Sequence, residues 1–371
     1  MPNWNLPWFP EWNKKNPTDV FGPAIVIGAA FSAVLFAALI ITWGSPYQTE
    51  SEQTGPAGTG MSVAKFISMK RAGDPTVEDY YTEEAYTPEA GDVLAKDVYE
   101  NVQVLGDLTE DNFTRLMGAI TQWVSPEQGC EYCHAGAADG NYADDDLYTK
   151  VVSRRMIQMN QWLNEEWGDH VGAAGVNCYT CHRGQNVPSD IWFRLAPLKE
   201  NSAGWSAVQN FATAQTVSTS LPHDALERYL LGEEDVAVHD LEPRVAGLAS
   251  DPDYRAWQHT ERTYSLMNYF SNSLGVNCTF CHNSRAFYDP AQHTPQWAVA
   301  QLARLMVQDT NNEYLVPLKD TYPENRLGPK HGDAPKAACK TCHKGWNKPM
   351  NGLDVISDWP ELATTGAPVY E

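Results

Sequence analysis

The residues of this chain best suited to chemistry lie in four copies of one short motif, C-x-x-C-H, which together use all eight cysteines. Two thiols three positions apart can form thioether bonds to the two vinyl groups of one porphyrin, and the histidine that follows can ligate its iron. The pattern therefore predicts four covalently attached haem c groups. In chain order the four motifs are Cys130/Cys133/His134, Cys178/Cys181/His182, Cys278/Cys281/His282 and Cys339/Cys342/His343.

Two other uses of eight cysteines must be weighed against haem attachment. An even cysteine count in an exported chain is typical of disulfide bonds, and paired C-x-x-C sequences are typical of zinc sites. Neither use requires a histidine directly after every second cysteine. Haem attachment does require it, so we favour that interpretation.

Each haem iron can take a second axial ligand, and methionine raises the redox potential relative to histidine. Three methionines precede the first three motifs on apolar helical patterns: Met117, Met156 and Met267. A methionine on such a pattern is often only a core residue. Because the three recur in register with haem motifs, we expect them to ligate iron, with Met159 as the alternative to Met156.

The fourth motif is expected to pair with a histidine. His170 lies 14 positions after Met156 in the segment Lys150–Gly172. If that segment is one continuous helix, the two side chains are about 21 Å apart and cannot ligate the same iron. We assign Met156 to the second motif and His170 to a distant haem, which leaves His170 or Met306 for His343. The remaining histidines are expected to be ordinary surface or core residues, namely His223, His239, His259, His293 and His331.

The elements that must position these residues are helices. Apolar residues recur at helical spacing after Thr109, which can cap a helix, and Thr294 followed by Pro295 marks another helix start. No convincing series of alternating strands is present, so the expected fold class is mainly α, built from helix–turn–C-x-x-C-H units. The near-identity of GVNCYTCH at 175–182 and GVNCTFCH at 275–282 suggests duplication.

One segment, 20–44, predicts a membrane anchor. Residues Val20–Trp43 contain no charged side chain, and about 20 apolar residues span a bilayer. The apolar run is too long for a cleaved signal peptide. We expect an N-terminal arm (1–19), the anchor helix, a linker (45–60) and a haem-bearing domain (61–371). Lys14 and Lys15 just before the span place the N-terminus in the cytoplasm and the large domain in the periplasm.

The charge balance bears on partners. The formal charge of −21 argues against nucleic acid, whose phosphates require Lys and Arg. An acidic rim near the first motif (Glu127, Glu131, Asp139 and Asp144–Asp146) could steer a basic soluble cytochrome to the protein, or could only keep the surface soluble. A high-potential iron–sulfur protein or a copper protein is an equally good candidate donor.

Longer stretches around the motifs carry a family resemblance that covers nearly all of residues 90–365. They are VLGDLTEDNFTRLMGAITQWVSPEQGCEYCH, VVSRRMIQMN, HVGAAGVNCYTCHRG, SLGVNCTFCHNSRAF and CKTCHKG. With them the chain resembles the tetrahaem cytochrome subunit of purple-bacterial photosynthetic reaction centres. Some members of that family carry a lipid on an N-terminal cysteine; a transmembrane helix takes its place here.

The resemblance implies three His/Met haems, through Met117, Met156 and Met267, and one His/His haem through His170. It also implies two local haem pairs related by an approximate two-fold axis, in a nearly linear chain. The third motif would lie nearest the special pair of the reaction-centre core, and the first motif would be outermost. The implied function is electron donation to the photo-oxidised special pair, not enzymatic catalysis. Contacts with light-harvesting subunits are a further expectation.

Two alternatives stay open at this point. An anchored multihaem quinol dehydrogenase that feeds periplasmic reductases would use mostly histidine as the second ligand, which the methionine pattern disfavours. A haem enzyme would need an iron with an open position. Every motif here has a candidate sixth ligand, so an enzyme is the weaker alternative.

Overall fold

The computed structural model describes residues 9–15, 22–42, 48–53, 61–66, 73–196, 208–236, 256–328 and 332–370. The chain divides into two compact units, Met1–Glu50 with Phe66–Arg71 and Ser51–Lys65 with Ala72–Glu371. Among the residues expected to be ordinary, His239 and His331 lie outside the described ranges.

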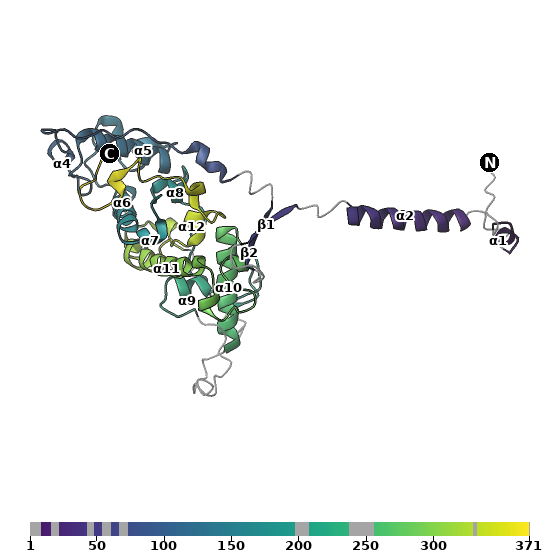
Figure 1. The fold of residues 1–371 in the computed structure, drawn as a ribbon. Helices are drawn as coiled ribbons and strands as arrows, with labels where there is room; N and C mark the ends of the chain where they lie inside the picture. The colour runs from purple at the N-terminus through teal and green to yellow at the C-terminus, as the bar shows by residue number, and fades with distance from the viewer. Residues whose placement is uncertain are drawn as a thin grey trace. The chain divides into compact units, whose positions relative to one another are not determined.

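The first unit contains two helices, α1 (Phe9–Lys15) and α2 (Gly22–Thr42) (Figure 1). The side chains of Ala24–Thr42 are not buried in the structure, and this stretch is long and apolar enough to cross a membrane. The length and composition of this helix support the expected anchor. Strands β1 (Thr49–Gln53) and β2 (Ser62–Phe66) form a two-stranded sheet, so part of the expected linker is a strand.

The described part of the second unit is mainly helical, as expected. Its α-helices are α4 (Ala95–Val98), α5 (Glu110–Val124), α6 (Tyr148–Glu166), α7 (Gly168–Val171), α8 (Cys178–His182), α9 (Ala225–Leu230), α10 (Ala256–Leu274), α11 (Pro295–Asp309) and α12 (Cys339–His343). Its 3-10 helices are η1 (Pro75–Asp79), η2 (Gly129–Tyr132), η3 (Ala137–Asp139), η6 (Cys278–Phe280), η7 (Pro290–Gln292), η9 (Val316–Asp320), η10 (Glu324–Arg326), η11 (Pro349–Gly352) and η12 (Pro360–Leu362). A π-helical turn, η8 (Thr310–Leu315), follows α11.

Both predicted helix starts are confirmed. The Thr109 hydroxyl accepts a hydrogen bond from the Asn112 amide at the start of α5, and Thr294 precedes Pro295 at the start of α11. The first turn of a helix leaves its amide groups without partners inside the helix. Thr109 accepts from one of them, and Pro295 has no amide hydrogen to satisfy.

The condition of one continuous helix through Lys150–Gly172 is not met. Helix α6 ends at Glu166, and Trp167 has the non-helical angles φ −114° and ψ 27°. Glycine at 168 follows at once, and glycine is unfavourable inside a helix because it loses the most conformational freedom on folding. His170 therefore lies on a separate short helix, α7, and its distance from Met156 does not follow the straight-helix estimate.

Among the described residues of the second unit, the core consists of two apolar clusters. One surrounds Trp123 and Trp359, whose rings meet edge to face at 4.7 Å, and includes Tyr179 of the second motif. The other surrounds Tyr229 and Leu266 and includes Cys339 of the fourth motif. The haem motifs are thus built into the cores of the domain.

Candidate haem-binding cavity

Residues of all four motifs line a single cavity of about 1030 Å³. The motif residues in its wall are Cys133, Cys178, Cys181, His182, Cys281, Cys339, Cys342 and His343. Cys130, His134, Cys278 and His282 are not in the wall, and both of these cysteines are exposed. Each motif therefore contributes at least one cysteine to the same space.

The cysteines are neither disulfide-bonded nor grouped as in a zinc site. All eight lie in described segments and none is in a disulfide bond; the sulfur atoms of Cys181 and Cys342 are 2.6 Å apart, beyond the 2.03–2.05 Å of a disulfide. Within the described ranges no three Cys, His, Asp or Glu side chains converge as metal ligands would. Burial raises the pKa of the Cys178 and Cys339 thiols to about 12. Neutral thiols in an apolar cavity fit thioether attachment better than thiolate ligation.

The second and fourth motifs share one local structure. Each is a five-residue α-helix, α8 or α12, in which a threonine hydroxyl accepts a hydrogen bond from the amide just before the first cysteine: Thr180 from Asn177 and Thr341 from Ala338. After each histidine comes a residue with positive φ, Arg183 (51°) or Lys344 (52°). These local bonds are encoded by the shared sequence C-x-T-C-H-(R/K)-G.

This turn brings a carbonyl back to each histidine. His182 Nδ1 lies 2.8 Å from the Gln185 carbonyl oxygen, and His343 Nδ1 lies 2.9 Å from that of Trp346. A carbonyl only accepts, so Nδ1 carries the proton and Nε2 keeps its lone pair for a metal. Burial also lowers the pKa of both histidines to about 4. Both imidazoles are therefore neutral at physiological pH, the form that ligates iron.

The first and third motifs form a second structural class. Both are 3-10 helices, η2 and η6, and their histidines bond to groups distant in sequence. His134 Nδ1 donates to the Tyr142 carbonyl oxygen at 3.0 Å, whereas His282 Nδ1 lies 3.3 Å from Nε2 of His293. His293 was expected to be an ordinary histidine; in the structure it contacts the third motif.

The first motif is thus structurally equivalent to the third, and the second motif to the fourth. Helix α5 packs against α8, and α10 packs against α12. The Gly184 amide donates to the Trp123 carbonyl, and the Gly345 amide donates to the Ser273 carbonyl. Trp123 and Ser273 each lie six residues after the predicted methionine ligand of their helix, so this hydrogen bond occurs at equivalent positions in the two halves. Sequence identity alone had pointed to a different pair, the second and third motifs.

The predicted methionine ligands occupy related places. Met156 lines the cavity directly, as do its alternative Met159 and the rival Met306. Met117 and Met267 are half-buried and outside the wall, yet the residues three and seven positions after each line it: Ile120 and Val124, and Phe270 and Leu274. These offsets return to the same helix face, so both methionines lie on the face that borders the cavity.

His170 is brought together with His343. Both line the cavity, and their ring centroids are 6.1 Å apart. Metal–imidazole bonds are about 2 Å long, so two imidazoles on opposite sides of one metal have centroids roughly 6 Å apart. The pair therefore has the spacing of a bis-histidine site.

Sequence reasoning missed the residues that hold the fourth motif. Asn311, fully buried in the π-helical turn η8, donates to the Ala337 carbonyl and accepts from the Ala337 amide. Trp192 Nε1 donates to the same carbonyl at 2.8 Å. No sequence pattern marks an asparagine as a clamp for a segment 26 positions away.

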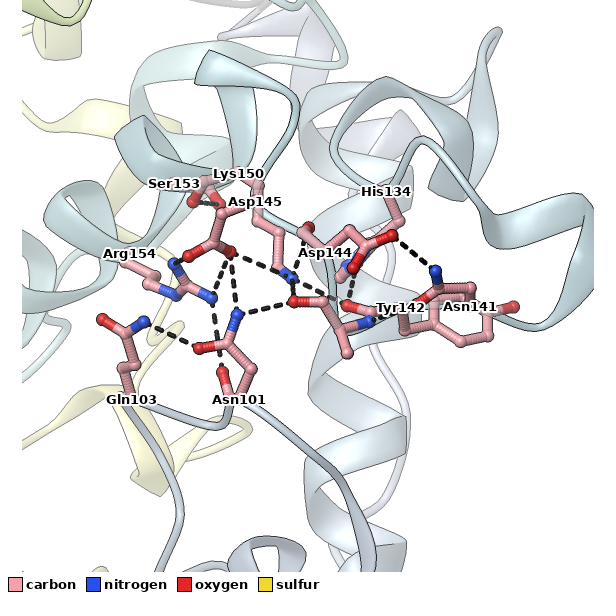
Figure 2. Close-up of polar contacts among 11 residues, drawn as sticks. Asn101, Gln103, His134, Asn141, Tyr142, Asp144, Asp145, Lys150, Ser153 and Arg154 are labelled. Carbon is pink, nitrogen blue, oxygen red and sulfur yellow. Dashed lines mark hydrogen bonds and ion pairs between the residues drawn. The ribbon is translucent and has the colours of Figure 1, made fainter.

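A polar network near the first motif compensates part of the negative charge of the acidic rim (Figure 2). The Asp145 carboxylate accepts two hydrogen bonds from Arg154 and one from Asn101, and Lys150 lies 3.2 Å away. These bonds, chiefly that from Arg154, lower the pKa of Asp145 well below its usual range. Its charge is compensated internally, so it contributes less to the rim than the sequence suggests.

Comparison with known proteins adds a family to this geometry. The family model for the photosynthetic reaction centre cytochrome C subunit matches residues 44–363. The chain belongs to this family. It is 64% identical to the photosynthetic reaction center cytochrome c subunit of Roseobacter denitrificans, over 98% of this chain and 99% of the relative. The same-named subunits of Rubrivivax gelatinosus and Thermochromatium tepidum are 41% and 39% identical, over 91% and 85% of this chain and 90% and 75% of theirs.

Membership in the reaction centre cytochrome c subunit family confirms the central expectation. The protein is an electron-transfer component of the photosynthetic reaction centre, not an enzyme, and it carries covalently bound haem c. As a reaction centre subunit it is membrane-associated and works with the reaction-centre core. The quinol dehydrogenase alternative is not favoured.

Proposed function

We propose that this cytochrome subunit carries four haem c groups, one on each C-x-x-C-H motif, and passes electrons along them to the photo-oxidised special pair. The observation that carries this proposal is the single cavity lined by cysteines of all four motifs. One continuous apolar space with cysteine at four places fits a chain of neighbouring porphyrins better than four isolated sites.

The same geometry supports an assignment of the axial ligands. His134, His182, His282 and His343 are the histidine ligands, and His170 is the second ligand opposite His343, a role supported by the 6.1 Å between their centroids. Met117, Met156 and Met267 are the second ligands of the first three motifs. The structural equivalence of the first and third motifs, and of the second and fourth, supports two haem pairs related by an approximate two-fold axis.

The bound haem supplies one-electron redox chemistry at iron. The chain's own part is to hold each imidazole neutral, with Nε2 free, and to exclude water with apolar side chains such as Val152, Leu163 and Phe270. Methionine ligands and low polarity both favour reduced iron. The chain thereby sets three sites at higher potential than the bis-histidine site.

We also propose where the partners bind. A soluble carrier docks near the first motif, and the third motif faces the reaction-centre core. A basic c-type cytochrome fits the exposed acids Glu127, Glu131, Asp139 and Asp146 best. Stopped-flow association should slow with added salt; an unchanged or rising rate would favour an iron–sulfur or copper protein, or docking without steering.

Helix α2 is proposed as a retained single-pass anchor, with the haem domain on the periplasmic side of the inner membrane. Lys14 and Lys15 fall in the last turn of α1, before the span, which supports a cytoplasmic N-terminus. An apolar helix of this length can also contact light-harvesting subunits within the bilayer.

One purification tests the proposal. Membranes are solubilised in mild detergent and the subunit is isolated by an affinity tag. Four haems per chain by the pyridine haemochrome assay, with bacteriochlorophyll absorbance in the same fraction, are expected. Fewer than four haems would contradict the assignment of one haem per motif. In that case a titration of free thiols would show how many cysteines are not attached to haem.

A further inference from the structure

His134 differs from the histidines of the second and fourth motifs in where its hydrogen bond goes. His182 and His343 bond to a carbonyl three residues later, inside the turn that ends each motif helix. His134 bonds to the carbonyl of Tyr142, eight residues later in an extended segment. That carbonyl is not placed by the motif itself, so other residues must hold it.

Lys150, in the first turn of α6, holds it. Its ammonium donates to three consecutive carbonyl oxygens, those of Tyr142 at 2.7 Å, Ala143 at 2.7 Å and Asp144 at 2.8 Å. An ammonium has three donor positions, and the three shortest contacts of this one are to the backbone of one loop; it also lies 3.2 Å from the Asp145 carboxylate of the same loop. The Lys150 side chain is only 7% exposed. The Tyr142 oxygen therefore accepts from His134 and from a buried cation at the same time (Figure 2).

The loop has further ties that do not involve Lys150. Arg154, one turn along α6, binds the Asp145 carboxylate through two nitrogens at 2.8 Å each. Asn101 donates to the Ala143 carbonyl and to Asp145. Loss of the Lys150 ammonium alone would therefore leave the loop attached to α6 through Asp145, while the Tyr142 carbonyl would lose the cation that holds it.

We propose that Lys150 is a positioning residue for the first haem: through the shared Tyr142 carbonyl it holds His134 and weakens the hydrogen bond that His134 donates. This inference rests on the proposed haem at the first motif. A carbonyl already bonded to a cation has less electron density for a second donor. The His134 imidazole then keeps a firmer Nδ1–H bond and gives less charge to iron, which disfavours the ferric state. Lys150 thus raises the potential of the first haem.

The test compares two variants on the same helix. Lys150→Met removes the charge and the carbonyl contacts and keeps an unbranched side chain of similar length. Arg154→Met removes an equal charge from a residue that is also largely buried, 14% exposed, and that does not bond to Tyr142. Redox titration of the detergent-solubilised complex follows each haem, and electron paramagnetic resonance reads the axial field of the ferric first haem.

In Lys150→Met the first haem should titrate at a lower potential and show a changed g-tensor, while the potentials of the other three haems should not change. Arg154→Met should give a smaller shift and an unchanged g-tensor. No shift in Lys150→Met, or equal shifts in both variants, would overturn the inference, because the effect would then be absent or would be charge acting through space.

Haem counts keep the two proposals distinguishable. A wild-type complex with no haem on the first motif would defeat the proposed function, whatever the variants do. If Lys150→Met does not accumulate, Lys150→Gln keeps amide donors for the loop without the charge. It should show the same fall in potential, and a wild-type potential in that variant would overturn the inference.

Discussion

At the scale of single residues, the second axial ligands decide how the four sites differ. His170 and His343 both line the cavity, with 6.1 Å between their ring centroids. His170→Met would convert this pair to His/Met. One titration wave should rise, by on the order of 0.1 V given that axial ligands tune haem over about 0.8 V, and the other three should stay. Spectroelectrochemical titration measures it, with Met350→Leu, another cavity-lining methionine, as the control.

A second residue-scale prediction separates Met156 from Met159, since both line the cavity. Met156→Leu should remove the sixth ligand of the second haem, lower its potential and allow carbon monoxide to bind to the reduced protein. Met159→Leu keeps the volume and should do neither. Carbon monoxide difference spectra of the two variants decide it; the reverse result would transfer the ligand role to Met159.

The residue scale also shows what sequence could predict. Spacing and family resemblance predicted the motif histidines, the proximity of His170 to the fourth motif and the cavity-facing positions of the methionines. The motif histidines are predictable because covalent attachment requires a ligand directly next to the second cysteine. The partner of each histidine Nδ1 does not follow. For His182 it comes from a local turn, but for His134 it depends on where a loop and α6 meet, which is a tertiary contact.

At the scale of elements, the junction of α10 with the end of the fourth motif is the tightest contact. Gly275 has φ 62°, and a Cβ there would overlap the Gly345 carbonyl oxygen. Gly140 has φ 77° with open space around it. Gly140→Ala should therefore cost about 1 kcal/mol, the backbone penalty alone. Gly275→Ala should cost about 1–3 kcal/mol more from overpacking.

Thermal unfolding of the two glycine variants, followed by far-ultraviolet circular dichroism, measures the difference in midpoint. Equal midpoints would mean that the α10 junction can relax at no cost. Sequence alone does not rank the two glycines, because the cost at Gly275 depends on a backbone 70 residues away. The helix starts at Thr109 and Thr294 were predictable because capping is local. The break of α6 was not, because apolar residues keep helical spacing up to Trp167 itself.

At the scale of the whole molecule, the repeat and the cavity belong together. The bonds from Gly184 to Trp123 and from Gly345 to Ser273 tie each methionine-bearing helix to a motif helix. Two such halves enclose one space lined by cysteines of every motif. The folded domain is therefore organised around its cofactors, and not around a continuous side-chain core of its own.

That organisation predicts that the domain cannot fold without haem. Without haem, a cavity of about 1030 Å³ would leave its largely apolar lining exposed to water, and apolar side chains stabilise a fold only when they are removed from water. A folded domain has only about 5–15 kcal/mol of stability. The chain produced in cells that lack the haem-attachment machinery should therefore be protease-sensitive, bind hydrophobic dyes and melt without a cooperative transition. The same chain produced with that machinery is the control. A haem-free domain with a sharp melting transition and native protease resistance would contradict this, because the side chains would then close the space themselves.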